Sequence, residues 1–169
     1  MGIWYEGLMR WVGPMKTVNA VGQSVINHRR DESGRRQAST IPDHVDITGE
    51  LELGGQMRLN VTTVAGLAAY PIDIHIFGSE GTLRLYQAPG GQTTLAAGKR
   101  GDKRLKDVKI PKSKQGVWRV EEEFINAIRG KEEITHTDFA TAVKYMEWTD
   151  AVTMSLRHRE VVKLPLMGN

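Results

Sequence analysis

The sequence predicts an α+β fold with two layers, in which a largely antiparallel, open-faced sheet of about eight strands carries two long helices on one face. Two observations lead to this class. Segments in which apolar and polar residues alternate follow one another between residues 17 and 110, as expected of strands with one buried face. Near the C-terminus the spacing of apolar residues becomes helical, and helices segregated from antiparallel strands are typical of two-layer α+β domains.

The composition excludes several classes of protein. A chain of 169 residues with 40% hydrophobic content can bury one core, so we expect residues 1–169 to form a single domain. No apolar run approaches roughly 18 residues, so we expect no membrane span. Cysteine is absent, which excludes disulfides, cysteine nucleophiles and thiolate metal sites. The lack of cysteine and of a signal-peptide pattern favours a cytoplasmic location.

The first elements are a short helix and a strand. Residues 3–11 have helical spacing, with Ile3, Leu8 and Trp11 on one side, and Gly13-Pro14 ends the helix. Residues 17–27 are predicted to be a strand. Residues 27–44 are polar and contain glycine, which predicts a long loop.

The clearest alternation in the chain lies in residues 45–53, and residues 57–61 continue it in a second strand. A two-residue Gly54-Gly55 turn would place polar residues on the buried face of this hairpin. The pattern therefore predicts a loop with an odd number of residues, most simply three, and a glycine in the left-handed conformation. In that register Arg58 faces Glu50 or Glu52.

Residues 72–86 predict a second hairpin, with Ile72, Ile74 and Ile76 on the buried face and a turn at residues 78–81. Weaker strands are expected at residues 93–97 and 106–110, and a closing strand at 159–164. One helix is expected around residues 117–128 and ends at Gly130. A second is expected to run from a capping box at Thr135 and Asp138 to about Leu156, with an apolar stripe of Phe139, Ala142, Met146, Val152 and Leu156.

The chain has a net charge of +3, and many of its basic residues lie in two clusters. One consists of Arg29, Arg30, Arg35 and Arg36, and the other spans residues 99–114. The second cluster has no interleaved aromatic residues and no recognisable reading element. We therefore favour solvated loops and expect no nucleic-acid partner, and we rank nucleic-acid binding through residues 99–114 last among the alternatives.

No motif for nucleotide binding, metalloprotease chemistry or a serine nucleophile is present. The five histidines, His28, His44, His75, His136 and His158, are dispersed. His44 with Asp43 and Asp46 is open to interpretation as a metal site, but its position after Pro42 favours a turn and cap, so we expect no metal. We expect His75 to be packed or interfacial.

The polar face of the expected sheet mixes charged and aromatic side chains. This mixture is typical of protein interfaces, although a simply solvated face is the alternative. We expect homo-oligomer contacts through Arg58, Asp73, His75, Phe77, Arg84 and Tyr86.

Three segments carry a resemblance to a known family: PDHVDITGELELGGQMRL (42–59), IHIFGSEGTLRL (74–85) and the stretch from FINAIRG to REVVKL (124–164). In this order they resemble the C-terminal domain of the glucose–fructose oxidoreductase / inositol dehydrogenase (Gfo/Idh/MocA) family. The resemblance implies an NAD(P)-dependent oxidoreductase of sugars or polyols. In that family an N-terminal Rossmann domain binds the nucleotide, and the α+β domain shapes the substrate pocket and mediates oligomerisation.

The sequence departs from the family at its N-terminal end. The Rossmann domain and its glycine fingerprint are absent from residues 1–169, and the short helix without a cap predicts that something precedes this chain. Aligning the helix places Trp4 where the family has a histidine and Gly7 where it has an aspartate. We therefore assign no catalytic residue and expect this chain alone to bind no cofactor, with NAD(P) implied only for the full-length protein.

We therefore expect a C-terminal substrate-binding and oligomerisation domain that is not catalytic by itself. The alternative is a free-standing, non-catalytic module for oligomerisation or small-molecule binding. In either case the expected partners are further copies of the chain and a small-molecule substrate, and the first case adds the missing Rossmann domain. The candidate substrate-binding residues are Trp4, Tyr5, His28, Arg29 and Arg30.

Overall fold

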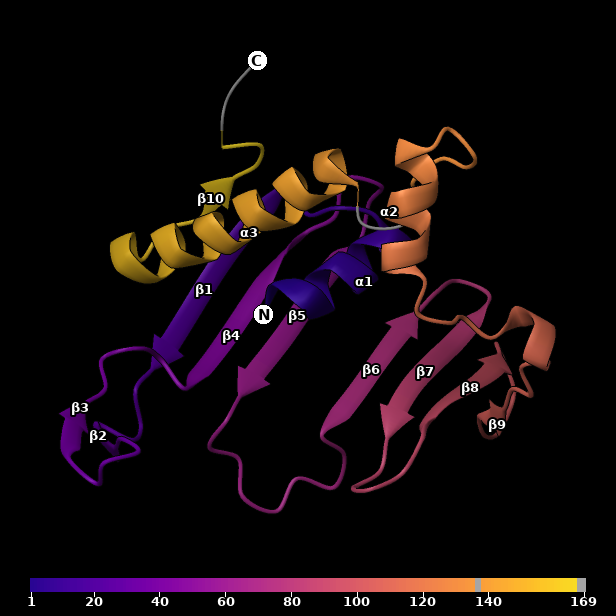
Figure 1. The fold of residues 1–169 in the computed structure, drawn as a ribbon. Coiled ribbons are helices and arrows are strands. Elements are labelled where there is room, and N and C mark those ends of the chain that lie inside the picture. The colour runs from indigo at the N-terminus through magenta and orange to yellow at the C-terminus, as the bar shows by residue number, and fades with distance from the viewer. Residues whose placement is uncertain (136–137, 167–169) are drawn as a thin grey trace. The chain divides into compact units, whose positions relative to one another are not determined.

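Hydrogen bonding sorts the strands of the computed structural model into two four-stranded antiparallel sheets and a two-stranded hairpin (Figure 1). The structure describes residues 1–135 and 138–166. Within these residues three α-helices accompany the strands, which confirms the α+β class. The chain divides into two compact units, one made of residues 1–64 and 119–169 and the other of residues 65–118.

The first unit contains a four-stranded sheet in the order β10-β1-β4-β5 and the separate hairpin β2-β3. Among its described residues, the strands of this unit pair antiparallel throughout. Its elements are α1 (Gly2–Val12), β1 (Thr17–Gln23), β2 (His28–Arg30), β3 (Arg36–Ala38), β4 (His44–Glu50), β5 (Gln56–Thr62), α2 (Val120–Ile128), α3 (Phe139–His158) and β10 (Val162–Lys163). The expected loop at residues 27–44 therefore contains a hairpin, whose three-residue strands are too short to show an alternating pattern.

The second unit is a sheet in the order β6-β7-β8-β9. Its strands are β6 (Ile72–Phe77), β7 (Gly81–Gln87), β8 (Thr93–Lys99) and β9 (Lys106–Asp107), followed by the 3₁₀ turn Lys112–Lys114. The alternation expected of Ile72, Ile74 and Ile76 is confirmed, because these residues are partly buried while their neighbours in β6 are exposed. The strand expected at residues 106–110 is shorter than predicted.

The core of the first unit forms where α3 packs against β1 and the apolar face of its sheet. Trp148 is fully buried and stacks on Tyr5, with ring centroids 4.0 Å apart. Fully or nearly fully buried sheet residues surround this pair: Val18, Ala20, Val45 and Ile47. Burial of one large aromatic pair of this kind contributes several kcal/mol, at about 25 cal/mol per Å² of apolar area.

The predicted apolar stripe of α3 is partly wrong. Val152 is buried and Leu156 packs against the core, but Phe139 is 84% exposed and Met146 is 52% exposed. The buried face instead carries Trp148, Ala151, Val152 and Ser155. Apolar residues occur on more than one face of this helix, so their spacing alone does not select the face that packs.

The predicted buried side of α1 is also partly wrong. Leu8 is buried as expected, but Ile3 is 78% exposed and Trp11 is 55% exposed. Tyr5 and Met9 are buried in their place. Tyr5 accepts a hydrogen bond from the backbone N–H of Met15 at 2.8 Å, so its hydroxyl has a partner inside the core.

The ladder of the hairpin β4–β5 leaves five residues, 51–55, in the loop, so the predicted odd count is confirmed but the simplest length, three, is not. Gly54 adopts a φ of 93°, the expected left-handed conformation. The predicted register is wrong, since Arg58 faces Thr48 rather than Glu50 or Glu52. The chain turns earlier than predicted, because Leu51 is nearly fully buried, forms an isolated bridge with Met15 and donates its N–H to the carbonyl of Gly55.

β1 and β4 approach each other closely at Gly49. A Cβ atom at this position would lie 1.9 Å from the carbonyl oxygen of Thr17. No side chain fits at that distance, so glycine is required here by packing rather than by its backbone angles.

Two further expectations concern the C-terminal helices. The N-cap of α3 is Asp138, whose carboxylate accepts a hydrogen bond from the N–H of Thr141 at 2.8 Å. Thr135 was predicted as the cap, which is wrong, because it instead donates to Glu123 of α2. His136, between Thr135 and Asp138, lies outside the described residues. No helix formed by the described residues is both long enough and apolar enough to cross a membrane.

Candidate functional site

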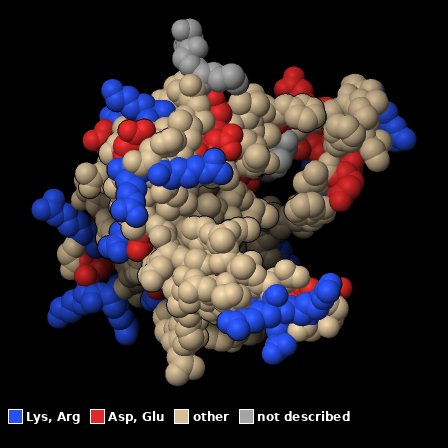
Figure 2. All heavy atoms as spheres, turned by 90° about the vertical axis from the view of Figure 1, so that its left-hand side faces the viewer, with Lys and Arg blue, Asp and Glu red and all other residues tan. Residues whose placement is uncertain are grey.

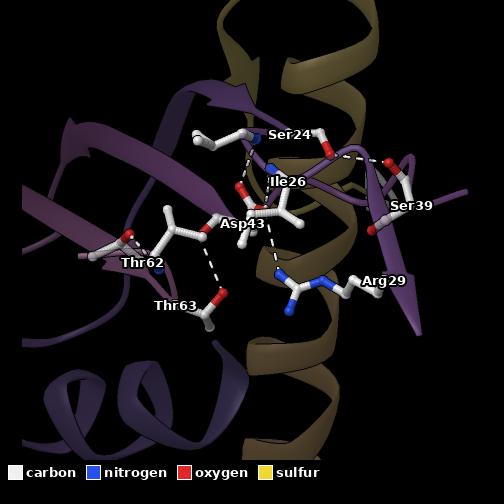
Figure 3. A network of polar contacts seen from close by, with 9 residues as sticks. Ser24, Ile26, Arg29, Ser39, Asp43, Thr62 and Thr63 are labelled. Carbon is white, nitrogen blue, oxygen red and sulfur yellow. Dashed lines mark hydrogen bonds and ion pairs between the residues drawn. The ribbon is translucent and has the colours of Figure 1, made fainter. Parts of the chain in front are cut away.

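Asp43 joins the base of the β2–β3 hairpin to the first sheet (Figure 3). Its carboxylate accepts hydrogen bonds from the backbone N–H groups of Val25 at 2.8 Å and Ile26 at 3.0 Å. The guanidinium of Arg29 lies 3.3 Å from the same carboxylate. The backbone carbonyl of Asp43 accepts a hydrogen bond from the N–H of Thr63. One buried carboxylate therefore fixes the start of the hairpin.

The donors around Asp43 favour its ionised form. The hydrogen bond from Val25, and with it those from Ile26 and Arg29, holds the pKa of this carboxyl below its usual range. The neighbouring His44 lies 3.4 Å from Asp46, whose other oxygen accepts from Asn60 at 2.9 Å. No cluster of three metal-binding side chains occurs in residues 1–135 and 138–166.

A second carboxylate, Asp31, holds the tip of the hairpin. One oxygen accepts from the N–H and the hydroxyl of Ser33 and from the N–H of Arg35. The other accepts from the side chain of Gln37 at 3.1 Å. These bonds, with that from the Ser33 hydroxyl largest, lower the pKa of Asp31. The hairpin is therefore fixed at both ends although each strand has only three residues.

The predicted substrate-binding residues fall into three environments. Tyr5 belongs to the core, where its ring and its hydroxyl are both in contact with other residues. Trp4 is 49% exposed on α1. His28, Arg29 and Arg30 form β2, where His28 and Arg30 share one face and Arg29 points to the other, toward Asp43.

The predicted interface residues of the second unit form a connected surface. Arg84 binds Asp73 through two hydrogen bonds of 2.8 and 3.0 Å. Its guanidinium lies 4.6 Å from the ring centre of Tyr70 and 4.5 Å from that of Tyr86. His75 faces Arg84 across the strands and stacks on Phe77. We call Tyr70, Asp73, His75, Phe77, Arg84 and Tyr86 the aromatic-arginine surface.

Arg84 governs the electrostatics of this surface. Its hydrogen bonds hold the pKa of Asp73 below the usual range, while the carboxylate raises the pKa of Arg84. Tyr70 was missed by sequence reasoning, because it lies outside any alternating segment. Arg58 lies in the first unit, where it is 76% exposed and 3.8 Å from Asp46.

The described residues do not fit a dinucleotide cofactor. A dinucleotide site requires a glycine-rich turn between a parallel strand and a helix. Here the turn at residues 78–81 joins two antiparallel strands, and every strand pair in the described part of the chain is antiparallel. No reaction step is therefore assigned to a nucleotide held by these residues.

No family model and no curated protein matches the sequence. Solved structures do match the fold. Levoglucosan dehydrogenase in complex with NADH and L-sorbose has a TM-score of 0.77 and 20% identity, over 95% of this chain and 48% of its own. An NAD binding oxidoreductase from Klebsiella pneumoniae has a TM-score of 0.74 and 14% identity, over 97% of this chain and 48% of its own.

A third similar structure is the WlbA dehydrogenase from Bordetella pertussis in complex with NADH and UDP-GlcNAcA. Its TM-score is 0.67 at 19% identity, over 98% of this chain and 44% of its own. The chain has the fold of one part of these dehydrogenases. It spans about half the length of each of them.

Proposed function

We propose that this chain is the substrate-binding and oligomerisation domain of an NAD(P)-dependent sugar or polyol oxidoreductase of the Gfo/Idh/MocA type. The observation that carries the proposal is the asymmetry of the structural matches, which take in 95–98% of this chain but 44–48% of NADH-bound dehydrogenases. The order of the three sequence segments, 42–59, 74–85 and 124–164, supports the same assignment.

In this role the chain contributes substrate contacts and assembly, and the nucleotide is held by a separate domain. Trp4, His28, Arg29 and Arg30 supply an exposed aromatic ring, an imidazole and two guanidinium groups. These groups suit the stacking and hydrogen bonding that sugars and sugar acids require. Tyr5 supports Trp4 indirectly, through the packing of α1.

The test is to sequence the reading frame upstream of codon 1 and to express its full product. We expect a glycine-fingerprint domain upstream and reduction of NAD⁺ with a member of a sugar and polyol panel. Removing residues 1–169 from that product should abolish sugar binding and leave NADH fluorescence quenching intact. A full product without NADH binding, or a stop codon directly upstream, would refute the assignment.

We further propose that the aromatic-arginine surface contacts a second copy of the chain. Phe77 is 78% exposed there, and Arg84 is already fixed by Asp73, so little side-chain entropy is lost when the surface becomes buried. Exposed aromatic and arginine side chains are enriched at interface centres. The free-standing module, as the alternative function, requires the same contact.

Sedimentation velocity at micromolar concentration tests this contact. We expect an oligomer for the wild type, and dissociation for both Arg84→Glu and Phe77→Ser. Lys109→Glu, which makes the same charge change as Arg84→Glu at an exposed site of the same unit, should remain oligomeric. A monomeric wild type, or an Arg84→Glu variant that is folded by circular dichroism and still assembles, would show that the surface is simply solvated.

A further inference from the structure

Two arginines face each other directly in the β2–β3 hairpin. The register pairs Arg30 with Arg36 and His28 with Ala38. Side chains paired in this way lie roughly 5 Å apart at Cβ, and like charges directly opposite destabilise an antiparallel pair. His28, Arg30 and Arg36 therefore form a small basic face, and all three are exposed.

The carboxylates of the hairpin do not neutralise this face. Asp31 already accepts four hydrogen bonds from Ser33, Arg35 and Gln37, about the full acceptor capacity of a carboxylate. Asp43 binds Arg29, which lies on the opposite side of β2. Glu32 is the third carboxylate, and within the described residues the ion pairs involve neither Glu32 nor Arg30 nor Arg36.

The backbone beneath the basic face is fixed in advance. Asp43 holds the residues before β2, Asp31 holds the turn, and Arg30 donates to the carbonyl of Gly34 at 2.8 Å. Only one of its five N–H donors is used in that bond. A two-stranded hairpin is marginally stable by itself. We infer that these contacts keep Arg30 and Arg36 side by side despite the repulsion between their charges.

We propose that His28, Arg30 and Arg36 bind the phosphate group of a phosphate monoester. Two guanidinium groups and an imidazole on adjacent strands match the three free oxygens of a phosphate monoester, and each guanidinium is able to donate two parallel bonds. Bound phosphate converts the repulsion between Arg30 and Arg36 into attraction to a shared anion. The site needs only this hairpin, and it stands whether or not the chain belongs to an oxidoreductase.

Figure 2 looks at the side of the chain that carries β2 and β3 in Figure 1 and shows lysine and arginine side chains in separate groups rather than spread evenly. Another basic cluster, at residues 99–114, belongs to the second unit. A test must therefore distinguish specific binding at the hairpin from the general attraction of anions to a chain with a net charge of +3.

Calorimetry and amide chemical shifts at constant low ionic strength provide the test, with glucose 6-phosphate, gluconate and glucose as probes. We expect glucose 6-phosphate to bind, to shift the amides of residues 28–38, and to raise the unfolding midpoint. Arg30→Ala and Arg36→Ala should each weaken binding at least tenfold, and Arg36→Lys less than that. Lys109→Ala, which removes one exposed positive charge from the second unit, should leave binding unchanged.

A second signature comes from stability without ligand. Because the repulsion disappears, Arg36→Gln should raise the unfolding midpoint of the free protein while losing the gain that glucose 6-phosphate gives the wild type. Equal binding by the wild type and both alanine variants would overturn the proposal, as would tighter binding of gluconate or of a DNA duplex than of glucose 6-phosphate. The oxidoreductase assignment rests on the structural matches and on NADH binding by the full product, so failure here leaves that assignment untouched.

Discussion

The hydroxyl of Ser155 accepts a hydrogen bond from the backbone N–H of Ala20 at 2.9 Å, between residues 135 positions apart in the sequence. The same hydroxyl donates to the carbonyl of Glu160 at 2.6 Å. Ser155 is fully buried, so one small polar side chain joins α3, β1 and the segment before β10 inside an apolar core. Ala20 is only 4% exposed, so its N–H has no access to water as a substitute, whereas Glu160 is an exposed residue.

Replacing Ser155 with alanine should destabilise the chain by about 2 kcal/mol, because the buried N–H of Ala20 is left unsatisfied and the hydrogen bond to Glu160 is lost. Urea unfolding followed by circular dichroism measures the change. Thr153→Ala is the control, since Thr153 donates only to Thr149 on the same helix and its loss should change stability by less than about 0.5 kcal/mol. Equal stability of the two variants would contradict this role of Ser155.

Replacing Tyr5 with phenylalanine keeps the ring stacked on Trp148 but removes the acceptor of the Met15 N–H. We expect a loss of about 1–3 kcal/mol, because a buried N–H is left unsatisfied. Burial raises the pKa of Tyr5. The stabilisation that neutral Tyr5 gives the folded chain is therefore fully present below the pKa of tyrosine in the unfolded chain, about 10. It is lost as the pH rises through the pKa of Tyr5 in the folded chain.

Thermal unfolding between pH 7 and 11 tests this dependence on Tyr5. The wild type should lose stability at high pH more steeply than Tyr5→Phe. Tyr86→Phe, in the second unit, is the control and should follow the wild type. A Tyr5→Phe variant as stable as the wild type at pH 7 would show that the Met15 N–H finds another acceptor.

Asp43→Asn should loosen the base of the hairpin. The amide is a weaker acceptor for Val25 and Ile26 and leaves Arg29 without its counter-ion, so hydrogen exchange at these two backbone amides should accelerate. The pKa of Asp43 is lowered in the folded chain. The stabilisation by its ionised carboxylate is therefore present above the pKa of aspartate in the unfolded chain, about 4, and is lost as the pH falls through the folded pKa. Asp107→Asn, at an exposed position, should leave exchange at residues 25 and 26 unchanged.

Two glycine substitutions should have opposite effects. In Gly49→Ala the new Cβ meets the carbonyl oxygen of Thr17 at 1.9 Å, and we expect a loss of about 3 kcal/mol because the two strands must move apart. In Gly7→Ala the new Cβ meets nothing within 4 Å in the middle of α1, so helix propensity should add about 1 kcal/mol. Thermal unfolding of both variants tests the pair, and two changes of the same sign would contradict it.

The sequence is informative where one face of an element is buried and uninformative where several faces are apolar. The alternation in residues 45–53 and 72–77 predicts β4 and β6, because one face of each strand is less exposed than the other, although β4 ends at Glu50. In α3 the exposed Phe139 and the buried Trp148 are both large and apolar. Contacts between distant parts of the chain, such as the stacking of Trp148 on Tyr5, determine which face packs.

The candidate sites depend even more on distant contacts. Composition identifies the arginines near residue 30, but the pairing of Arg30 with Arg36 requires the register of a hairpin whose strands are too short for periodicity. The two carboxylates that hold the hairpin are those of Asp31, in an acidic turn, and Asp43, directly after Pro42. In the sequence, neither can be distinguished from an ordinary aspartate of a loop. Tyr70 joins the aromatic-arginine surface only through the folded position of Arg84.

The absence of a side chain at Gly49 also restricts how β1 and β4 align. A slip of two residues keeps the apolar face buried, so hydrophobic patterning alone tolerates it. Such a slip would bring Ile47 or Leu51 to the point where the Thr17 carbonyl leaves no room for a Cβ. Only one alignment is sterically open there, and a single glycine thus prevents the sheet from forming in the neighbouring, equally apolar registers.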